Sequence, residues 1–112
     1  MKQSRLSAYR IMWVFVFFDL PTNTKVEKKA YSRFRKNLLT DGFTMMQYSV
    51  YIRHCASKES AEVHIKKVQS FAPGKGQISI LQITDKQFGR IINYWGNKPP
   101  PKNKTGAQLE LF

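Results

Sequence analysis

The chain has 112 residues, of which 42% are apolar and 13% aromatic; this suits one folded domain with a hydrophobic core and excludes a disordered chain. Nineteen lysines and arginines stand against seven acidic residues, and a net charge of +12 is typical of a protein that binds a polyanion, most often nucleic acid. The single cysteine, Cys55, excludes an internal disulfide and a cysteine-based zinc site, and it fits a cytoplasmic protein.

The first predicted element is a strand over residues 10–20. Its apolar run VFVFF, residues 14–18, does not alternate with polar residues, so we expect cover on both faces. The run is too short to span a bilayer. It ends in Asp19, which is either a metal ligand or a turn residue that bonds nearby backbone N–H groups. The residues alone favour the turn.

The next predicted element is a basic helix. Thr24-Lys-Val-Glu27 has the spacing of a capping box, and Gly42 is a typical stop after residue 41. Apolar residues at every fourth position predict a buried stripe. The stripe consists of Val26, Ala30, Phe34 and Leu38.

Cations occupy much of the rest of this helix. Either they form an ordinary solvated face, or they bind phosphates without reading sequence. We favour phosphates, because like charges four residues apart slightly destabilise an isolated helix and Glu27 is the only acid of this helix before Asp41. The predicted nucleic-acid-binding residues are Lys25, Lys28, Lys29, Arg33, Arg35 and Lys36.

The remaining elements complete an α+β pattern. Residues 43–54 predict a strand that Gln47-Tyr48-Ser49 divides in two. Ser57 caps a predicted helix at about 58–71, residues 77–84 predict a strand, and the capping box from Thr84 to Gln87 predicts a short helical turn. Residues 91–95 predict a final short strand. The order is ferredoxin-like βαββαβ with an extra C-terminal strand, in a domain of residues 1–96 that precedes a tail of residues 97–112.

Four stretches in this order resemble one family. They are FFDLP, RFRKNLLTDGF, QYSVY and ITDKQFGRII. Together they resemble CRISPR-associated protein two, the small subunit of the spacer-acquisition machinery. FDLPTNTKVEKKAYSRFRKNLLTDGF followed by MMQYSVYIR is most similar to the branch of type II systems. The resemblance covers residues 9–96.

The resemblance implies a homodimer in which Asp19 lies near the two-fold axis and faces its symmetry mate. It implies a metal-dependent nuclease on RNA or DNA, with Asp19 as the catalytic residue and the ligand of Mg²⁺. It also implies a structural role, in which the dimer bridges two dimers of the larger integrase subunit on duplex prespacer DNA. The resemblance further implies that the bridging role does not need the acid.

Other polar residues give weaker evidence for a functional role. Ser49 either contacts a phosphate or metal-bound water, or is a small residue at a kink, and no nucleophilic triad accompanies it. His54 and His64 lack a metal-ligand pattern, and His64 is expected to be partly exposed. Three functions compete: the bridging subunit, a free-standing endoribonuclease and an RNA-recognition module. The third needs an aromatic stacking motif in its third strand, and KGQISILQI has none.

The composition of residues 97–112 predicts a flexible, partly extended segment that ends in a docking peptide. Residues 97–107 contain three prolines and three lysines and no apolar stripe. The peptide is QLELF, with Gln108, Leu109, Leu111 and Phe112 as the expected contact residues. One expected partner is the larger integrase subunit, through strand addition. The other is the bacterial sliding clamp, because QLELF resembles the short peptide by which replication and repair proteins hold it.

Overall fold

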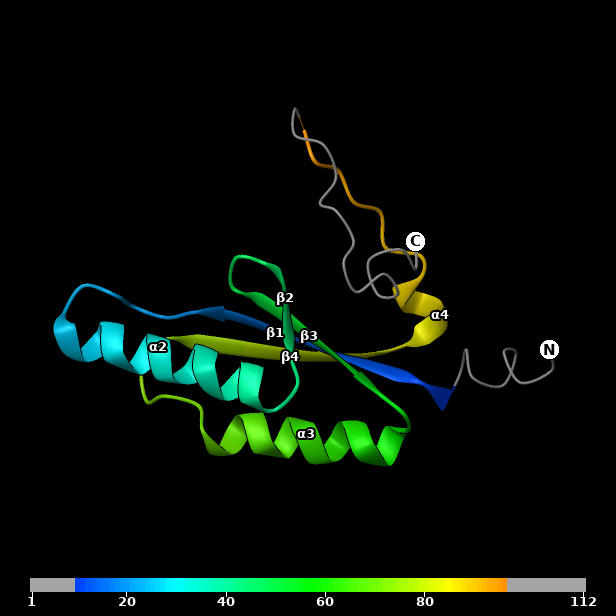
Figure 1. Ribbon diagram of the computed structural model, residues 1–112, viewed down its shortest axis with the longest axis horizontal. Coiled ribbons are helices and arrows are strands. Elements are labelled where there is room, and N and C mark those ends of the chain that lie inside the picture. Colours follow the sequence, from blue (N-terminus) through cyan, green and yellow to red (C-terminus); the bar gives the residue numbers. More distant parts are fainter. Residues whose placement is uncertain (1–9, 97–112) are drawn as a thin grey trace.

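A four-stranded antiparallel sheet forms the centre of the computed structural model, which describes residues 10–96 (Figure 1). The sheet order is β2-β3-β1-β4, and each neighbouring pair is antiparallel. This confirms the predicted α+β class and the ferredoxin-like order. The elements are β1 (Met12–Asp19), α2 (Lys25–Thr40), β2 (Thr44–Gln47), β3 (Val50–Cys55), α3 (Lys58–Ser70), β4 (Gln77–Thr84) and α4 (Asp85–Phe88).

One face of the sheet carries the two long helices, α2 and α3 (Figure 1). Alternate residues of β1 point to this side, and Val14 and Val16 have no exposed surface. Phe34 and Leu38 from α2 meet them, and Phe34 packs edge-on against Phe18 with ring centroids 5.0 Å apart. Full burial of a side chain of this size stabilises the fold by about 1.5–3 kcal/mol. This layer is therefore the main core.

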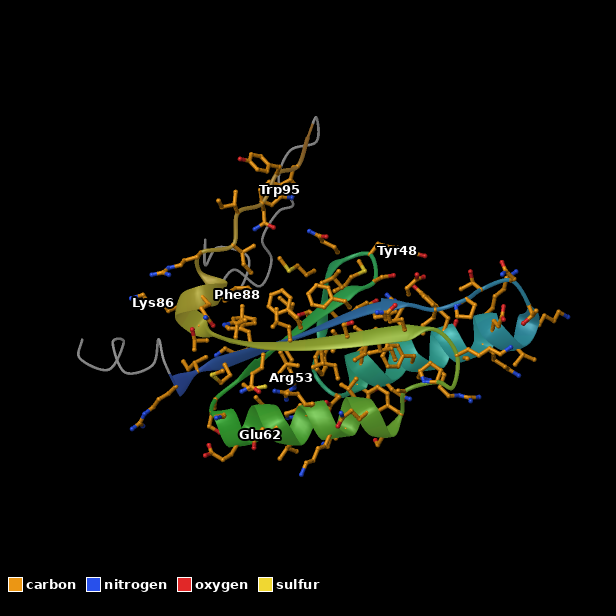
Figure 2. The ribbon with its side chains drawn as sticks, turned by 180° about the vertical axis from the view of Figure 1, so that it is seen from behind. Tyr48, Arg53, Glu62, Lys86, Phe88 and Trp95 are labelled. Atoms are coloured by element: carbon orange, nitrogen blue, oxygen red, sulfur yellow. The ribbon has the colours of Figure 1, made fainter. Side chains whose placement is uncertain are left out.

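The opposite face is covered at one end only. Trp13 stacks on Phe88 of α4 with ring centroids 3.9 Å apart, and its Nε1 donates a hydrogen bond to Asp85 at 2.7 Å. Figure 2 shows Phe88 on the side of α4 toward the sheet. At the other end of β1, Phe17 is 37% exposed and Asp19 is exposed. The predicted cover on both faces is wrong there, because α4 has only four residues.

The predicted helix ends are confirmed. Thr24 and Glu27 form a reciprocal capping box, Ser57 caps α3, and Gly42 follows α2 with φ +95°. The predicted burial of Val26 is wrong, since its side chain is 78% exposed. At the first turn of α2 the neighbouring loops leave an open pocket beside Val26.

The predicted break between two strands is confirmed. β2 and β3 form a hairpin with a register shift between Met45 and Gln47, and Ser49 in its turn has φ +68°. The extra strand predicted at residues 91–95 is wrong for this single chain. That segment runs away from the sheet (Figure 1), and Tyr94 is 90% exposed. A strand needs a neighbouring strand to satisfy its backbone groups, and no strand of residues 10–96 pairs with this segment. Within residues 10–96, no helix has the length and hydropathy to cross a membrane.

Candidate nucleic-acid interface and metal site

The predicted phosphate-binding residues form one face of α2. All six are exposed. At 3.6 residues per turn they fall on the half of the helix opposite Phe34, along a helix about 24 Å long. We call this set the basic face, which consists of Lys25, Lys28, Lys29, Arg33, Arg35 and Lys36.

The charge of the basic face is not neutralised within the described residues. The ion pairs there join His64 and Lys67 to Asp41, and Lys75 to Glu27. None of these pairs includes a cation of the basic face. Six uncompensated positive charges on one helix create a local field that attracts an anionic polymer. The arrangement suits phosphate oxygens spaced along a nucleic-acid backbone.

Asp19 lies at a separate place, on the other side of the sheet from α2. It is the last residue of β1 and pairs in register with Gln77 of β4. It lines an open hollow of about 330 Å³ together with Ser49, Gln77 and Ser79. Carboxylate, hydroxyl and amide oxygens are hard ligands of the kind that Mg²⁺ accepts, alongside waters and substrate phosphate.

Among residues 10–96, Asp19 is the one carboxylate that lines this hollow. Asp41 accepts a hydrogen bond from His64 Nδ1 at 2.7 Å and pairs with Lys67, and Asp85 is bonded to Trp13 at the far end of β1. Among the described residues no three His, Cys, Asp or Glu side chains gather as metal ligands. The described donor set thus offers Mg²⁺ one carboxylate together with neutral hydroxyl and amide oxygens.

The hairpin turn beside Asp19 is held in a costly conformation. The αL region costs a non-glycine residue roughly 1–2 kcal/mol, and Ser49 occupies it. Its carbonyl accepts a hydrogen bond from the N–H of Phe18 at 3.1 Å, one residue before Asp19. Strained residues often occur at functional sites. The positive φ at Ser49 is therefore compatible with the predicted contact role as well as with turn chemistry.

Tyr31 is a contact residue that the sequence pattern did not single out. Its side chain interacts with Tyr48 and Ser49 and so ties α2 to the hairpin turn. Burial, followed by the Tyr48 contact, raises the pKa of Tyr31 above 10.0. Residue 31 is adjacent to the buried stripe on the helix circumference, but a contact to a turn 17 residues away is not local and has no sequence signature.

Both histidines contact other side chains away from Asp19. His64 is half-buried, as expected, and its bond to Asp41 joins α3 to the end of α2. Arg53 reinforces the same corner, since its Nε donates to the Asp41 carbonyl at 2.7 Å. Figure 2 shows Arg53 between β3 and α3. His54 packs edge-on against Trp13, with centroids 5.2 Å apart. None of these residues lines the hollow at Asp19.

Comparison with known proteins shows the family to which the chain belongs. The model of the family CRISPR associated protein Cas2 matches residues 12–91, so the chain belongs to that family. It is 54% identical over 109 residues to a CRISPR-associated endoribonuclease Cas2 of Flavobacterium psychrophilum, covering 97% of this chain and 95% of that protein. It is 58% identical over 101 residues to the protein of the same name from Parvibaculum lavamentivorans, covering 90% of this chain and all of the relative. It is 40% identical over 98 residues to the one from Streptococcus mutans, covering 88% and 90%.

Proposed function

We propose that this protein is the DNA-binding structural subunit of a CRISPR spacer-integration complex, in which its dimer bridges two dimers of the larger integrase subunit. The observation that carries the proposal is the basic face, whose six exposed cations have no carboxylate partner among the described residues. A helix of this length can hold several phosphates of one duplex at once. The contacts are to the backbone, which suits the capture of DNA of any sequence.

The exposed apolar residues of the sheet support dimerisation. On the sheet side away from α2 and α3, Phe17 is 37% exposed and Leu81 is 48% exposed. Leaving such a patch in water is unfavourable, and a second copy would cover it. Asp19 lies beside Phe17 on the same strand. A two-fold axis near this end of β1 would bring two Asp19 carboxylates together.

The test is assembly with purified components. The protein, the larger integrase subunit and a blunt duplex are mixed at moderate salt and separated by size. The account expects one complex that contains all three. If the integrase and this protein elute apart whether or not DNA is present, the bridging function is wrong.

A metal-dependent nuclease is the second candidate function. The hollow around Asp19 and the name endoribonuclease borne by the relatives favour it. Asp19, with its symmetry mate, would hold Mg²⁺, which when bound neutralises phosphate charge and lowers the pKa of a bound water. The polar side chains of Gln77 and Ser79 would orient the phosphodiester. Cleavage should be slow, because no described residue in the hollow is a histidine or a second carboxylate that could act as general base.

The two functions separate cleanly by experiment. Highly purified protein is incubated with single-stranded RNA, single-stranded DNA or duplex DNA, with Mg²⁺ or with a chelator. Cutting that needs Mg²⁺ and disappears in Asp19→Asn would establish the nuclease. Intact substrate together with integrase assembly would leave the structural role alone.

A separate proposal concerns the partners of residues 97–112, which lie outside the described residues. Leu109, Leu111 and Phe112 are three large apolar side chains among the last four residues of the sequence. We propose that they dock on the larger integrase subunit, and that the sliding clamp is the competing partner. A peptide of residues 98–112 should bind one of the two purified proteins, and Leu111→Ala with Phe112→Ala should abolish that binding. A peptide that binds neither would refute the docking role.

A further inference from the structure

An apolar pocket opens beside the basic face, at the point where β1 passes into α2. Its volume is about 300 Å³, at the lower end of the range for small-molecule sites. It lies between the first two turns of α2 and the turn at residues 73–75. The residues that line it include Leu20, Pro21, Val26, Ala30, Tyr31 and Pro73.

Two features of the lining indicate a binding surface. Val26 is 78% exposed, so an apolar side chain stands in water at the pocket edge without a folding role. Tyr31 is firmly anchored, because it packs against Phe18 with ring centroids 5.9 Å apart and contacts the hairpin turn. The pocket thus offers an aromatic ring that packs against the core, together with aliphatic groups.

The rim of the pocket is positively charged. Lys75 lines it and is 77% exposed, and its distance of 3.8 Å to Glu27 makes a loose ion pair. Glu27 already accepts hydrogen bonds from the backbone N–H groups of Asn23 and Thr24 at 2.9 and 3.1 Å. Both of these bonds reach Oε1 of Glu27, whereas Lys75 faces Oε2. Lys25 and Lys28 flank Val26 on the outer side of the same helix.

From this combination we propose that the pocket holds an unpaired nucleobase of the bound nucleic acid. A flat apolar base fits against an aromatic ring and aliphatic groups, while Lys75, Lys25 and Lys28 bind its flanking phosphates. Charge complementarity selects this occupant over an apolar peptide, which would provide no anionic partner for Lys25 and Lys28. The inference rests on the proposed nucleic-acid binding and extends it to substrates with a single-stranded or frayed end.

The test compares two duplexes of equal length and charge. Each carries a short single-stranded end, which has thymine bases in one and abasic sugar-phosphates in the other. Stacking of one base contributes enough that the parent protein should bind the thymine form roughly five- to a hundredfold more tightly. Equal affinity of the parent protein for both duplexes would overturn the proposal.

Three variants test whether the preference for the thymine form depends on the pocket. Ala30→Leu fills the pocket, and Val26→Ser removes an exposed apolar group, so each should reduce the thymine preference without weakening the abasic form. Leu39→Ser is the matched control, because Leu39 is an exposed apolar residue of α2, 41% exposed, that does not line the pocket. If Ala30→Leu fails to fold, Val26→Ser decides alone, since Val26 does not contribute to the core.

A thymine preference that persists in the folded pocket variants, or that is lost equally in Leu39→Ser, would overturn the proposal. Failure of the wider nucleic-acid function is a distinct result. In that case neither duplex binds, or a variant with Arg33→Ala and Arg35→Ala binds both duplexes as tightly as the parent does.

Discussion

Removing two arginines from the basic face should change the salt dependence of DNA binding by a calculable amount. Arg33 and Arg35 are exposed on α2 and have no ion-pair partner among the described residues. If each arginine binds one phosphate, the double substitution Arg33→Ala and Arg35→Ala makes the slope of log affinity against log salt less negative by about 1.8 per chain. If all six cations hold phosphates, the parent slope is about −5 per chain. Between 50 and 200 mM salt, the parent should therefore lose roughly tenfold more affinity than the variant.

The assay is fluorescence anisotropy with one labelled duplex at several salt concentrations, repeated with a duplex of unrelated sequence. The loss should be equal for both sequences, because phosphate contacts carry no base information. Lys58→Ala with Arg90→Ala is the matched control. It removes the same charge from exposed positions outside α2, one in α3 and one after α4. An unchanged slope in the α2 variant, or an equal change in the control, would refute the assignment of DNA binding to the basic face.

Three further predictions concern single residues. Asp19→Asn should abolish any Mg²⁺-dependent cleavage, measured on labelled RNA and DNA, and leave dimerisation by gel filtration intact; a variant that still cuts would make Asp19 a turn residue. Ser49→Gly should raise the free energy of unfolding by up to about 1 kcal/mol, because glycine adopts a positive φ without the steric cost that serine bears; a lower midpoint in denaturant would show that the serine side chain outweighs this strain. Burial raises the pKa of the Cys55 thiol above 9.0 in the folded state. The stabilisation that results from this shift is complete below pH 9.0 and is lost as the pH rises through the pKa of the folded state. The free energy of unfolding, measured between pH 8 and 10.5, should decline less steeply with pH in Cys55→Ala than in the parent, and equal slopes would contradict this.

The helices were predictable because local spacing determines them. The capping box at Thr24, the stop at Gly42 and the stripe through Phe34 and Leu38 all depend on residues within a few positions of each other. The same spacing left the cations outside this stripe, over much of the rest of the helix. The candidate phosphate-binding surface could therefore be read from the sequence before its exposure was known.

The errors have a common cause, which is dependence on distant parts of the chain. Periodicity assigned Val26 to the core, but it carries no information on where the neighbouring loops end. The apolar run of β1 predicted two covered faces, and the cover over Phe17 depends on how far α4 extends. Residues 91–95 have strand-like composition, yet a strand forms only where another strand lies beside it.

The site could be predicted only in part for the same reason. Asp19 was identified by its place at the end of an apolar run. Its neighbours Gln77 and Ser79 come from β4, and their contribution follows from the pairing of β1 with β4. The contacts of Tyr31 with the hairpin turn also join distant segments. Side chains brought together by sheet register have no mark in a single sequence.

The most direct test of the central claim is to reconstitute the complex with the larger integrase subunit and duplex DNA, using the parent protein and two variants. Size-exclusion chromatography with light scattering at moderate salt would measure its composition. The account predicts that the parent protein and Asp19→Asn both form a complex containing the integrase and DNA, and that Arg33→Ala with Arg35→Ala releases the DNA. A complex that forms equally well with the arginine variant but is lost in Asp19→Asn would contradict it, because the carboxylate and not the basic face would then support assembly.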